Sequence, residues 1–308
     1  MKTHNRCNRM RRRLKDYRSE CAKKTAPPDA HLRTALVYDF DGTLAHGNAQ
    51  EHSFFPKLLN IEKADFWNAV RDSKEKHNAD ENLIFLYLML KLAGERDISI
   101  TRQLLQEHGR TIPLFVGVDR WFDRINAFAA ERGLALEHYI ISSGNGEIIE
   151  GSPIASRFTR IFASKYLYDE HGVAIWPATS INYTSKTQFL FRINKGILNY
   201  WNSEGVNRWM PPGERPIPFS RIIYLGDGDT DIPSMKMVRY QGGHSVAVFD
   251  LDTWQNKSHQ KKVYNLIAED RAHYVVPGDY REGSLLDVTM KGILGKIARD
   301  EAGYRTRL

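Results

Sequence analysis

Five short apolar runs, rich in β-branched and aromatic residues, recur along the chain at wide spacing. They are "ALVYDF" (35–40), "HYIIS" (138–142), "RIIYLGD" (221–227), "SVAVFD" (245–250) and "HYVV" (273–276). Each run is continuous rather than alternating, which is typical of parallel strands covered on both faces. Helical patterns lie between them, at 120–133, 186–201 and 284–298. This alternation of strands and helices predicts an α/β fold with a doubly wound, mostly parallel sheet.

One segment breaks the alternation, because residues 47–116 show helical patterns and no convincing strand. We therefore expect a helical domain inserted between the first two strands, with hinges at Gly47 and at 113–117. The α/β core is then expected to comprise residues 33–46 and 117–308. A second irregular stretch, 201–220, contains four prolines and is interpreted as a surface loop.

The positive charge of the chain is concentrated at its N-terminus. Residues 1–30 hold ten Lys and Arg against three Asp and Glu, whereas the rest of the chain holds 34 of each sign. We interpret residues 1–32 as a basic arm, most simply a solvated and poorly ordered leader. An arm that binds nucleic acid or another anionic surface is the alternative from a different functional class.

Hydrophobic content and cysteine usage limit the class of protein. With 42% hydrophobic residues the chain can bury a large core. The longest strongly apolar run, "LIFLYLML" at 83–90, is far shorter than the roughly 18 residues that a membrane span requires. Only two cysteines occur, Cys7 and Cys21, which excludes a disulfide framework. We therefore expect a cytoplasmic protein without a membrane span.

Polar side chains follow several of the predicted strands. They are Asp39 and Asp41 after the first, Ser142 and Ser143 after the second, Asp227, Asp229 and Asp231 after the third, and Lys186 at a helix start. Open α/β sheets bind ligands at the carboxyl ends of their strands, so these groups should meet at one edge. Clustered carboxylates repel one another, and a hard cation such as Mg²⁺ relieves that repulsion. The pattern predicts a magnesium and phosphate site.

Other metal and nucleotide sites are excluded by their spacing. An EF-hand beginning at Asp227 would need Gly at its sixth position and Glu at its twelfth, where the chain has Ile232 and Val238. The sequence contains no P-loop, and "GNGEII" (144–149) lacks the third glycine of a dinucleotide fingerprint. The cysteines have no histidine pair nearby, which argues against structural zinc.

Four segments in order resemble the four signatures of the haloacid dehalogenase (HAD) superfamily: "DFDGT" (39–43), "IISSG" (140–144), Lys186 and "GDGDTD" (226–231). The resemblance covers about residues 33–298. It looks closest to the phosphoserine-phosphatase-like branch, because "ISSGNGEIIEG" matches without a gap and a helical cap would occupy 47–116. The resemblance implies a Rossmann-like HAD core, with a strand and hairpin over 161–186 leading to the lysine.

The resemblance also implies the catalytic and metal-binding roles. Asp39 would be the nucleophile that forms an aspartyl-phosphate, and Asp41 would be the general acid and then the base. Asp39, the backbone carbonyl of Asp41, and Asp227 would bind Mg²⁺. An acid at the position of Asp41 is typical of the phosphatases and absent from the dehalogenases, so we reject dehalogenation.

The phosphate-binding roles leave alternatives open. Ser142 and Lys186 would bind the transferring phosphoryl group, and Asp231 would orient Lys186 or a metal-bound water. Ser143 is the alternative phosphate ligand, and Lys195 is the alternative lysine. Asp231 is also a candidate N-cap of the following helix. Asp229 is interpreted as a loop acid.

The expected function is therefore Mg²⁺-dependent hydrolysis of a small phosphomonoester through an aspartyl-phosphate. A phosphotransferase with the same covalent intermediate is the alternative within enzymes. The branch also binds its substrate through a cap acid and a cap arginine, for which Glu51 and Arg71 are the candidates here. Glu51 comes later than the acid of the branch and Arg71 is chosen by residue type alone, so we expect a phosphomonoester other than phosphoserine.

Overall fold

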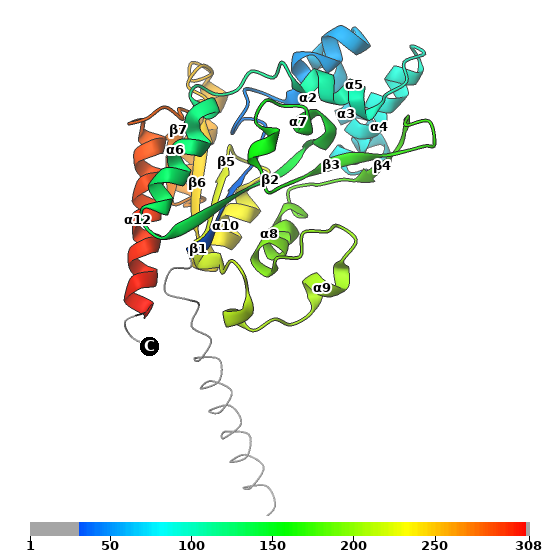
Figure 1. Ribbon diagram of the computed structural model, residues 1–308. Helices are drawn as coiled ribbons and strands as arrows, with labels where there is room; N and C mark the ends of the chain where they lie inside the picture. The colour runs from blue at the N-terminus through cyan, green and yellow to red at the C-terminus, as the bar shows by residue number, and fades with distance from the viewer. Residues whose placement is uncertain (1–30, 306–308) are drawn as a thin grey trace, which may run out of the picture.

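The structure, a computed structural model, describes residues 31–305. A seven-stranded sheet forms its centre, in the spatial order β4-β3-β2-β1-β5-β6-β7 (Figure 1). The strands are β1 (Leu32–Tyr38), β2 (Leu134–Asn145), β3 (Arg160–Tyr168), β4 (Ala174–Thr179), β5 (Ile222–Gly226), β6 (His244–Phe249) and β7 (Tyr274–Pro277). All neighbouring strands run parallel except β3 and β4, which form an antiparallel hairpin. The doubly wound sheet is confirmed, and each of the five apolar runs contributes one strand.

Strand β1 lies at the centre of the sheet and is buried on both faces. Val37 pairs with Tyr139 of β2 on one side and with Tyr224 of β5 on the other. Because successive side chains point to opposite faces, Leu36 and Tyr38 belong to one hydrophobic core cluster, whereas the residues beside them belong to another. A strand with two buried faces needs a continuous apolar sequence, as observed.

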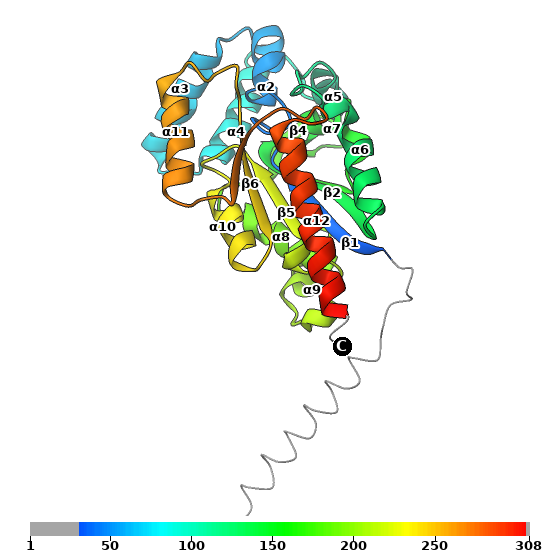
Figure 2. The ribbon, with the colours of Figure 1, turned by 90° about the vertical axis from the view of Figure 1, so that its left-hand side faces the viewer.

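Helices cover both faces of the sheet. α6 (Val118–Ala130) and α12 (Leu285–Arg305) lie side by side on one face, as Figure 2 shows, with Trp121 and Leu286 in the same core cluster. α8 (Lys186–Lys195) and α10 (Ile232–Tyr240) pack on the other face, through Phe189 and Met235 among others. The second face also receives Leu266 of α11 (Lys257–Ala268).

Residues between β1 and α6 are helical, as expected. They form α2 (Ala49–His52), the π-helix η1 (Phe54–Leu59), α3 (Lys63–His77), α4 (Glu81–Gly94) and α5 (Arg102–Gly109). This helical group lies beyond one end of the sheet, against the β3–β4 hairpin (Figure 1). Its buried Phe55, Phe66 and Leu86 belong to the same core cluster as one face of the sheet. The boundaries of a separate cap domain at 47–116 stay a prediction.

Helix α8 is shorter than the pattern over 186–201 predicted. It ends at Lys195 because Gly196 takes a left-handed conformation with φ of 68°. The Ile197 N–H then donates to the Arg192 carbonyl at 2.9 Å, which closes the helix end. The chain beyond forms the irregular, proline-rich loop that was expected, interrupted by α9 (Ser203–Asn207), η3 (Pro212–Glu214) and η4 (Phe219–Arg221).

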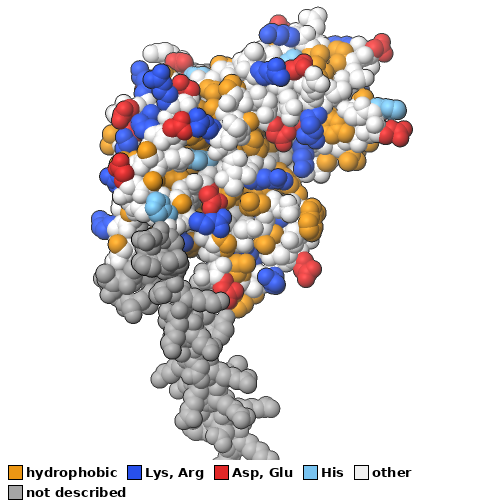
Figure 3. Space-filling view, in the orientation of Figure 1, with side chains coloured by type: hydrophobic (Ala, Val, Ile, Leu, Met, Phe, Trp, Pro, Cys, Tyr) orange, Lys and Arg blue, Asp and Glu red, His pale blue; other side chains and the backbone are white. Residues whose placement is uncertain are grey.

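The remaining short elements are α7 (Gly146–Glu150), which follows β2 directly, and η2 (Ala155–Arg157). Lys, Arg, Asp and Glu side chains are intermingled on the face of the molecule seen in Figure 3, consistent with the balanced charge outside residues 1–30. The basic arm expected at 1–32 falls almost wholly outside the described residues. Within residues 31–305, no helix is long and apolar enough to cross a membrane.

Candidate active site

A cavity of about 460 Å³ opens at the carboxyl edge of the sheet, where the helical group approaches the strand ends. Its floor is formed by residues from separate segments, most of which the sequence patterns had predicted to meet. The lining on this side comprises Asp39, Asp41, Gly42, Ser142, Ser143, Gly144, Asp227, Asp229, Thr230 and Lys262. The expected convergence of these groups at one sheet edge is therefore observed.

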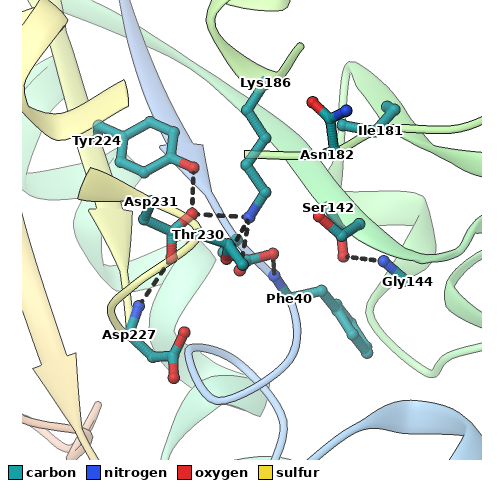
Figure 4. Close-up of polar contacts among 12 residues, drawn as sticks. Phe40, Ser142, Gly144, Ile181, Asn182, Lys186, Tyr224, Asp227, Thr230 and Asp231 are labelled. Carbon is teal, nitrogen blue, oxygen red and sulfur yellow. Dashed lines mark hydrogen bonds and ion pairs between the residues drawn. The ribbon is translucent and has the colours of Figure 1, made fainter. Parts of the chain in front are cut away.

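Lys186 is the centre of the hydrogen-bond network beneath the cavity (Figure 4). Its Nζ donates to Asp39 Oδ2 at 2.8 Å and to Asp231 Oδ1 at 2.7 Å, and it lies 3.5 Å from Thr230 Oγ1. The lysine has no exposed surface. Burial alone would lower the pKa of this ammonium group, but the carboxylates of Asp231 and Asp39 outweigh it and raise the pKa.

Asp231 fixes the position of the lysine from the opposite side. Its Oδ1 also accepts from the Tyr224 hydroxyl at 2.6 Å, and its Oδ2 accepts from the Asp227 backbone N–H at 3.1 Å. It occupies the N-cap position of α10, but its side chain makes no capping hydrogen bond there. The N-cap position is therefore confirmed, but the side chain does not cap the helix, because its oxygens bond Lys186, Tyr224 and the Asp227 N–H.

Asp39 and Asp41 lie in the turn that follows β1. Asp39 Oδ1 accepts from the Phe40 N–H at 2.7 Å, and Asp41 Oδ1 accepts from the Ala49 N–H at 2.9 Å. Burial, followed by the Asp231 carboxylate, raises the pKa of Asp39 well above its ordinary value. Burial raises the pKa of Asp41 to about 7. A carboxyl that titrates near pH 7 can both donate and accept a proton, as acid–base catalysis requires.

Two glycines allow this turn and its neighbours to approach closely. Gly42 adopts φ of 70°, and a Cβ there would lie 2.7 Å from the Asp227 carboxylate. A Cβ at Gly144 would lie 2.8 Å from Asp41 Oδ2. The Asp-Gly pair in "DFDGT" therefore serves the packing of the two acidic loops.

Ser142 and Ser143 both line the cavity, so the choice between them stays open. Ser142 is buried, and its Oγ accepts from the Gly144 N–H at 3.0 Å, which leaves its hydroxyl proton free to donate. The Ser143 Oγ is buried without a hydrogen-bond partner. Both lie within β2, whose pairing with β3 shifts register between Ile141 and Asn145.

Lys195 does not take part in the site. Its Nζ donates to the carbonyls of Val206 and Arg208, at 2.6 and 2.7 Å, and so stabilises the loop after α8. The structure therefore favours Lys186 over Lys195. Lys262 of α11 was not predicted to belong to the site, yet its Nζ lies 3.1 Å from Asp227 Oδ2. No motif marks this lysine, because it comes from a helix 35 residues after the aspartate.

The wall opposite the floor comes from the helical group and comprises Asn48, Gln50, Glu51, Trp67, Glu81, Asn82 and Phe85. Glu51 Oε1 accepts from the Asn48 amide at 2.6 Å and from the Trp67 indole N–H at 2.7 Å. Arg71, the candidate cap arginine, does not line the cavity; it is exposed and donates to Asn68. Among the lining residues within 31–305, the only basic side chain is Lys262.

The floor fits a divalent cation by its donor set. Carboxylate oxygens of Asp39, Asp227 and Asp231 lie within 4.8 Å of one another. Oxygen-only ligands of this kind suit Mg²⁺, which commonly combines one or two carboxylates with waters and a substrate phosphate. Asp39 and Asp227 line the cavity, whereas Asp231 does not and its two oxygens accept hydrogen bonds from Lys186, Tyr224 and the Asp227 N–H.

No family model matches the sequence. A curated relative, an uncharacterized protein of Borreliella burgdorferi, is 26% identical over 276 residues, which cover 82% of this chain and 93% of the relative.

Solved structures show the fold. A HAD family hydrolase from Salmonella enterica serovar Typhi superposes with a TM-score of 0.51 and 15% identity, over 81% of this chain and 69% of its own. A probable phosphoserine phosphatase from Vibrio cholerae superposes with a TM-score of 0.50 and 14% identity, over 89% of this chain and 69% of its own. The arrangement of strands and helices built from this sequence is the fold of the HAD-family hydrolases.

Proposed function

We propose that this protein is a Mg²⁺-dependent phosphomonoester hydrolase that works through an aspartyl-phosphate on Asp39. The observation that carries the proposal is the buried Lys186, hydrogen-bonded to both Asp39 and Asp231 beneath a solvent-accessible cavity. Asp41, with a pKa of about 7, lines the same cavity. A nucleophile, a fixed cation and an acid–base group are the parts that phosphoryl transfer needs.

The proposed reaction has two steps. In the first, an Asp39 carboxylate oxygen bonds to phosphorus while the bond from phosphorus to the alcohol oxygen breaks, and Asp41 gives its proton to that oxygen. In the second, Asp41 takes a proton from water as the water oxygen attacks phosphorus. The bond between phosphorus and Asp39 breaks, and inorganic phosphate leaves.

The residues around Asp39 are proposed to hold the phosphoryl group and the metal. Ser142, with Ser143 as the alternative, and Lys186 bind the phosphoryl oxygens. Asp39, Asp227 and the backbone carbonyl of Asp41 hold Mg²⁺, which offsets the negative charge of the phosphate and the carboxylates. Asp231 keeps Lys186 in position through the contacts described above.

The helical group is proposed to act as a cap over the core. Residues 47–116 then cover the site formed by 33–46 and 117–308, and the hydrogen bond from the Ala49 N–H to Asp41 links the two. Such a cover excludes water from the reacting groups when the substrate is bound.

The cavity wall indicates the kind of substrate. Glu51 is the largely buried charge of the cap side, with 13% of its side chain exposed. The lining residues described above include no arginine that could bind a carboxylate of the substrate. We propose a small metabolite whose organic part is neutral or carries an amine, rather than an amino acid phosphate such as phosphoserine.

Phosphate release from a panel of phosphomonoesters tests the proposal, with Mg²⁺ and with EDTA. Wild type should release phosphate only with Mg²⁺, and Asp39→Asn should release none. Asp229→Asn is the matched control, because this acid lines the same cavity but takes no part in the proposed chemistry; it should remain active. Release that survives in Asp39→Asn would show that another group is the nucleophile.

Two alternatives are separated by further arms of the same experiment. Alcohols added to the assay reveal a phosphotransferase if phosphorylated alcohol forms in place of free phosphate. The nucleic-acid or anionic-surface hypothesis concerns residues 1–30, which lie outside the described part, and it stays a prediction. It requires salt-dependent binding that disappears when those residues are removed.

A further inference from the structure

Lys262 brings a positive charge to a carboxylate that is expected to bind metal. Its Nζ lies 3.1 Å from Asp227 Oδ2, and about a third of each side chain is exposed. The lysine comes from α11, which contributes no other residue to the cavity floor. Lys186 does not pair with the Asp227 carboxylate, because its ammonium group is bonded to Asp39 and Asp231.

The path of the Lys262 side chain depends on Gly228. A Cβ at that glycine would lie 2.0 Å from Lys262 Cε and 2.4 Å from its Nζ. The lysine therefore passes over the loop after β5 at a point where only a residue without a side chain leaves room. The flexible end of the Lys262 side chain therefore lies directly against the loop that carries Asp227.

The Lys262 side chain also has space into which it can turn away from Asp227. A second hollow of about 360 Å³ adjoins the active-site cavity, and the two share Asp229 and Lys262 in their walls. Asp229 lines this second hollow and offers a carboxylate to a displaced ammonium group, whereas Glu269, which also lines it, is bonded to Arg271. A long, flexible and partly exposed side chain can make such a move without a change in the backbone.

We propose that Lys262 is a displaceable counter-ion of Asp227, which occupies this carboxylate in the metal-free protein and turns into the second hollow when a divalent cation binds. The inference rests on the magnesium site of the proposed function. It assigns Lys262 a role in setting metal affinity: the cation has to replace an existing ion pair at Asp227. Lys262 is thus a positioning residue, since it acts on the site through Asp227.

Calorimetric titration of Mg²⁺ into metal-free protein tests this role without an activity assay. Lys262→Met should bind Mg²⁺ roughly five- to tenfold more tightly than wild type, because the competing charge is gone. Lys262→Arg keeps a competing cation and should stay within about twofold of wild type. Lys261→Met is the matched control, since this lysine precedes it on α11 and lines only the second hollow.

Thermal unfolding in EDTA and in Mg²⁺ provides a second readout. In EDTA, Lys262→Met should unfold at a lower temperature than wild type, because Asp227 loses its partner. When Mg²⁺ is added, the unfolding temperature of Lys262→Met should rise more than that of wild type. Weaker or unchanged Mg²⁺ binding in Lys262→Met would overturn the inference. An equal increase in Mg²⁺ affinity in Lys261→Met would also overturn it.

Failure of the inference and failure of the proposed function are distinguishable. If neither wild type nor Lys262→Met binds Mg²⁺, the counter-ion role is wrong. The proposed function would then no longer include a magnesium ion. Phosphate release in EDTA that depends on Asp39 would then still support the hydrolase. If Mg²⁺ binds as expected but no ester is hydrolysed, the counter-ion role stands and the hydrolase proposal fails.

Discussion

The floor and the wall of the cavity are built differently. On the floor, Asp39, Lys186 and Asp231 are at most 4% exposed and bonded to one another. On the wall, Glu51 and Trp67 come from helices and are bonded to each other rather than to the floor. The aspartates of the floor follow strands of the sheet and its lysines come from helices, whereas the wall comes from the helical group alone. We therefore expect the chemistry to depend on the floor and the choice of substrate to depend on the wall.

The largest effect is expected from breaking the floor at Lys186. Lys186→Met should lower kcat by at least about 10³-fold, because the phosphoryl group loses its cation and two carboxylates face each other unpaired. Steady-state kinetics measures the loss, and circular dichroism checks folding. Lys195→Met, a lysine from the same helix bonded only to loop carbonyls, should keep near wild-type kcat. The reverse result would move the site to Lys195.

A second effect on the floor concerns proton transfer by Asp41. Asp41→Asn should lower kcat by about 10²-fold for alkyl phosphates, whose leaving oxygen needs a proton. The pKa of about 7 means that the acid form is lost as the pH rises above 7, so wild-type kcat should fall there. The pH–rate profile of the variant should lack this decline. An aryl phosphate, whose leaving group needs little protonation, is the control substrate.

An intermediate effect is expected from the wall at Glu51. Glu51→Gln should raise KM about tenfold for an amine-bearing phosphomonoester and change it little for glycerol phosphate, because only the amine is attracted by the carboxylate. Glu81→Gln is the matched control, since that acid lines the same cavity but is exposed and bonded to Lys74. A loss of kcat for every ester in Glu51→Gln would contradict the division between floor and wall.

The smallest effect at neutral pH concerns the free energy of unfolding and a buried histidine, His138. His138 is buried and hydrogen-bonded to Tyr38 and Asn126, and burial lowers its pKa to about 4. The unfolded chain takes up this proton near pH 6.5, so the free energy of unfolding should fall as the pH drops below 6.5 and stay level above it. We expect a loss of about 2 kcal/mol between pH 7 and pH 5 from this group.

Urea unfolding at the two pH values measures this loss. In His138→Gln the part of the pH dependence that belongs to the imidazole should disappear. If the free energy of unfolding of the variant depends on pH as strongly as that of wild type, His138 does not cause the loss of stability. The measurement also tells whether a fall in activity at acid pH reflects Asp41 or unfolding.

Most of the fold was predictable because its signals are local. Continuous apolar runs marked β1, β2, β5, β6 and β7, since a strand covered on both faces leaves no polar alternation. The end of α8 was missed by six residues, because Gly196 stops the helix although the apolar pattern continues. A glycine can continue a helix or adopt a left-handed turn, so the apolar pattern alone does not show where the helix ends.

The candidate site was predictable only on its floor. Asp39, Asp227 and Asp231 stand at strand ends in short motifs, so topology alone brings them together. Lys262 could not be predicted, because its approach depends on where α11 packs and on the space above Gly228. Arg71 was a reasonable candidate by residue type, but its face of α3 points to solvent. Such positions depend on helix rotation, which no short motif encodes.

The central place of β1 has a consequence for how the chain is made. Its residues leave the ribosome before those of the other described strands, yet Val37 pairs with Tyr224, which is synthesised much later. At roughly 5–20 residues per second, one edge of this apolar strand waits on the order of 10–40 s for its partner. An unpaired apolar edge invites association with other chains. We therefore expect the helical group and β2, which emerge in between, to shelter β1 in the nascent protein.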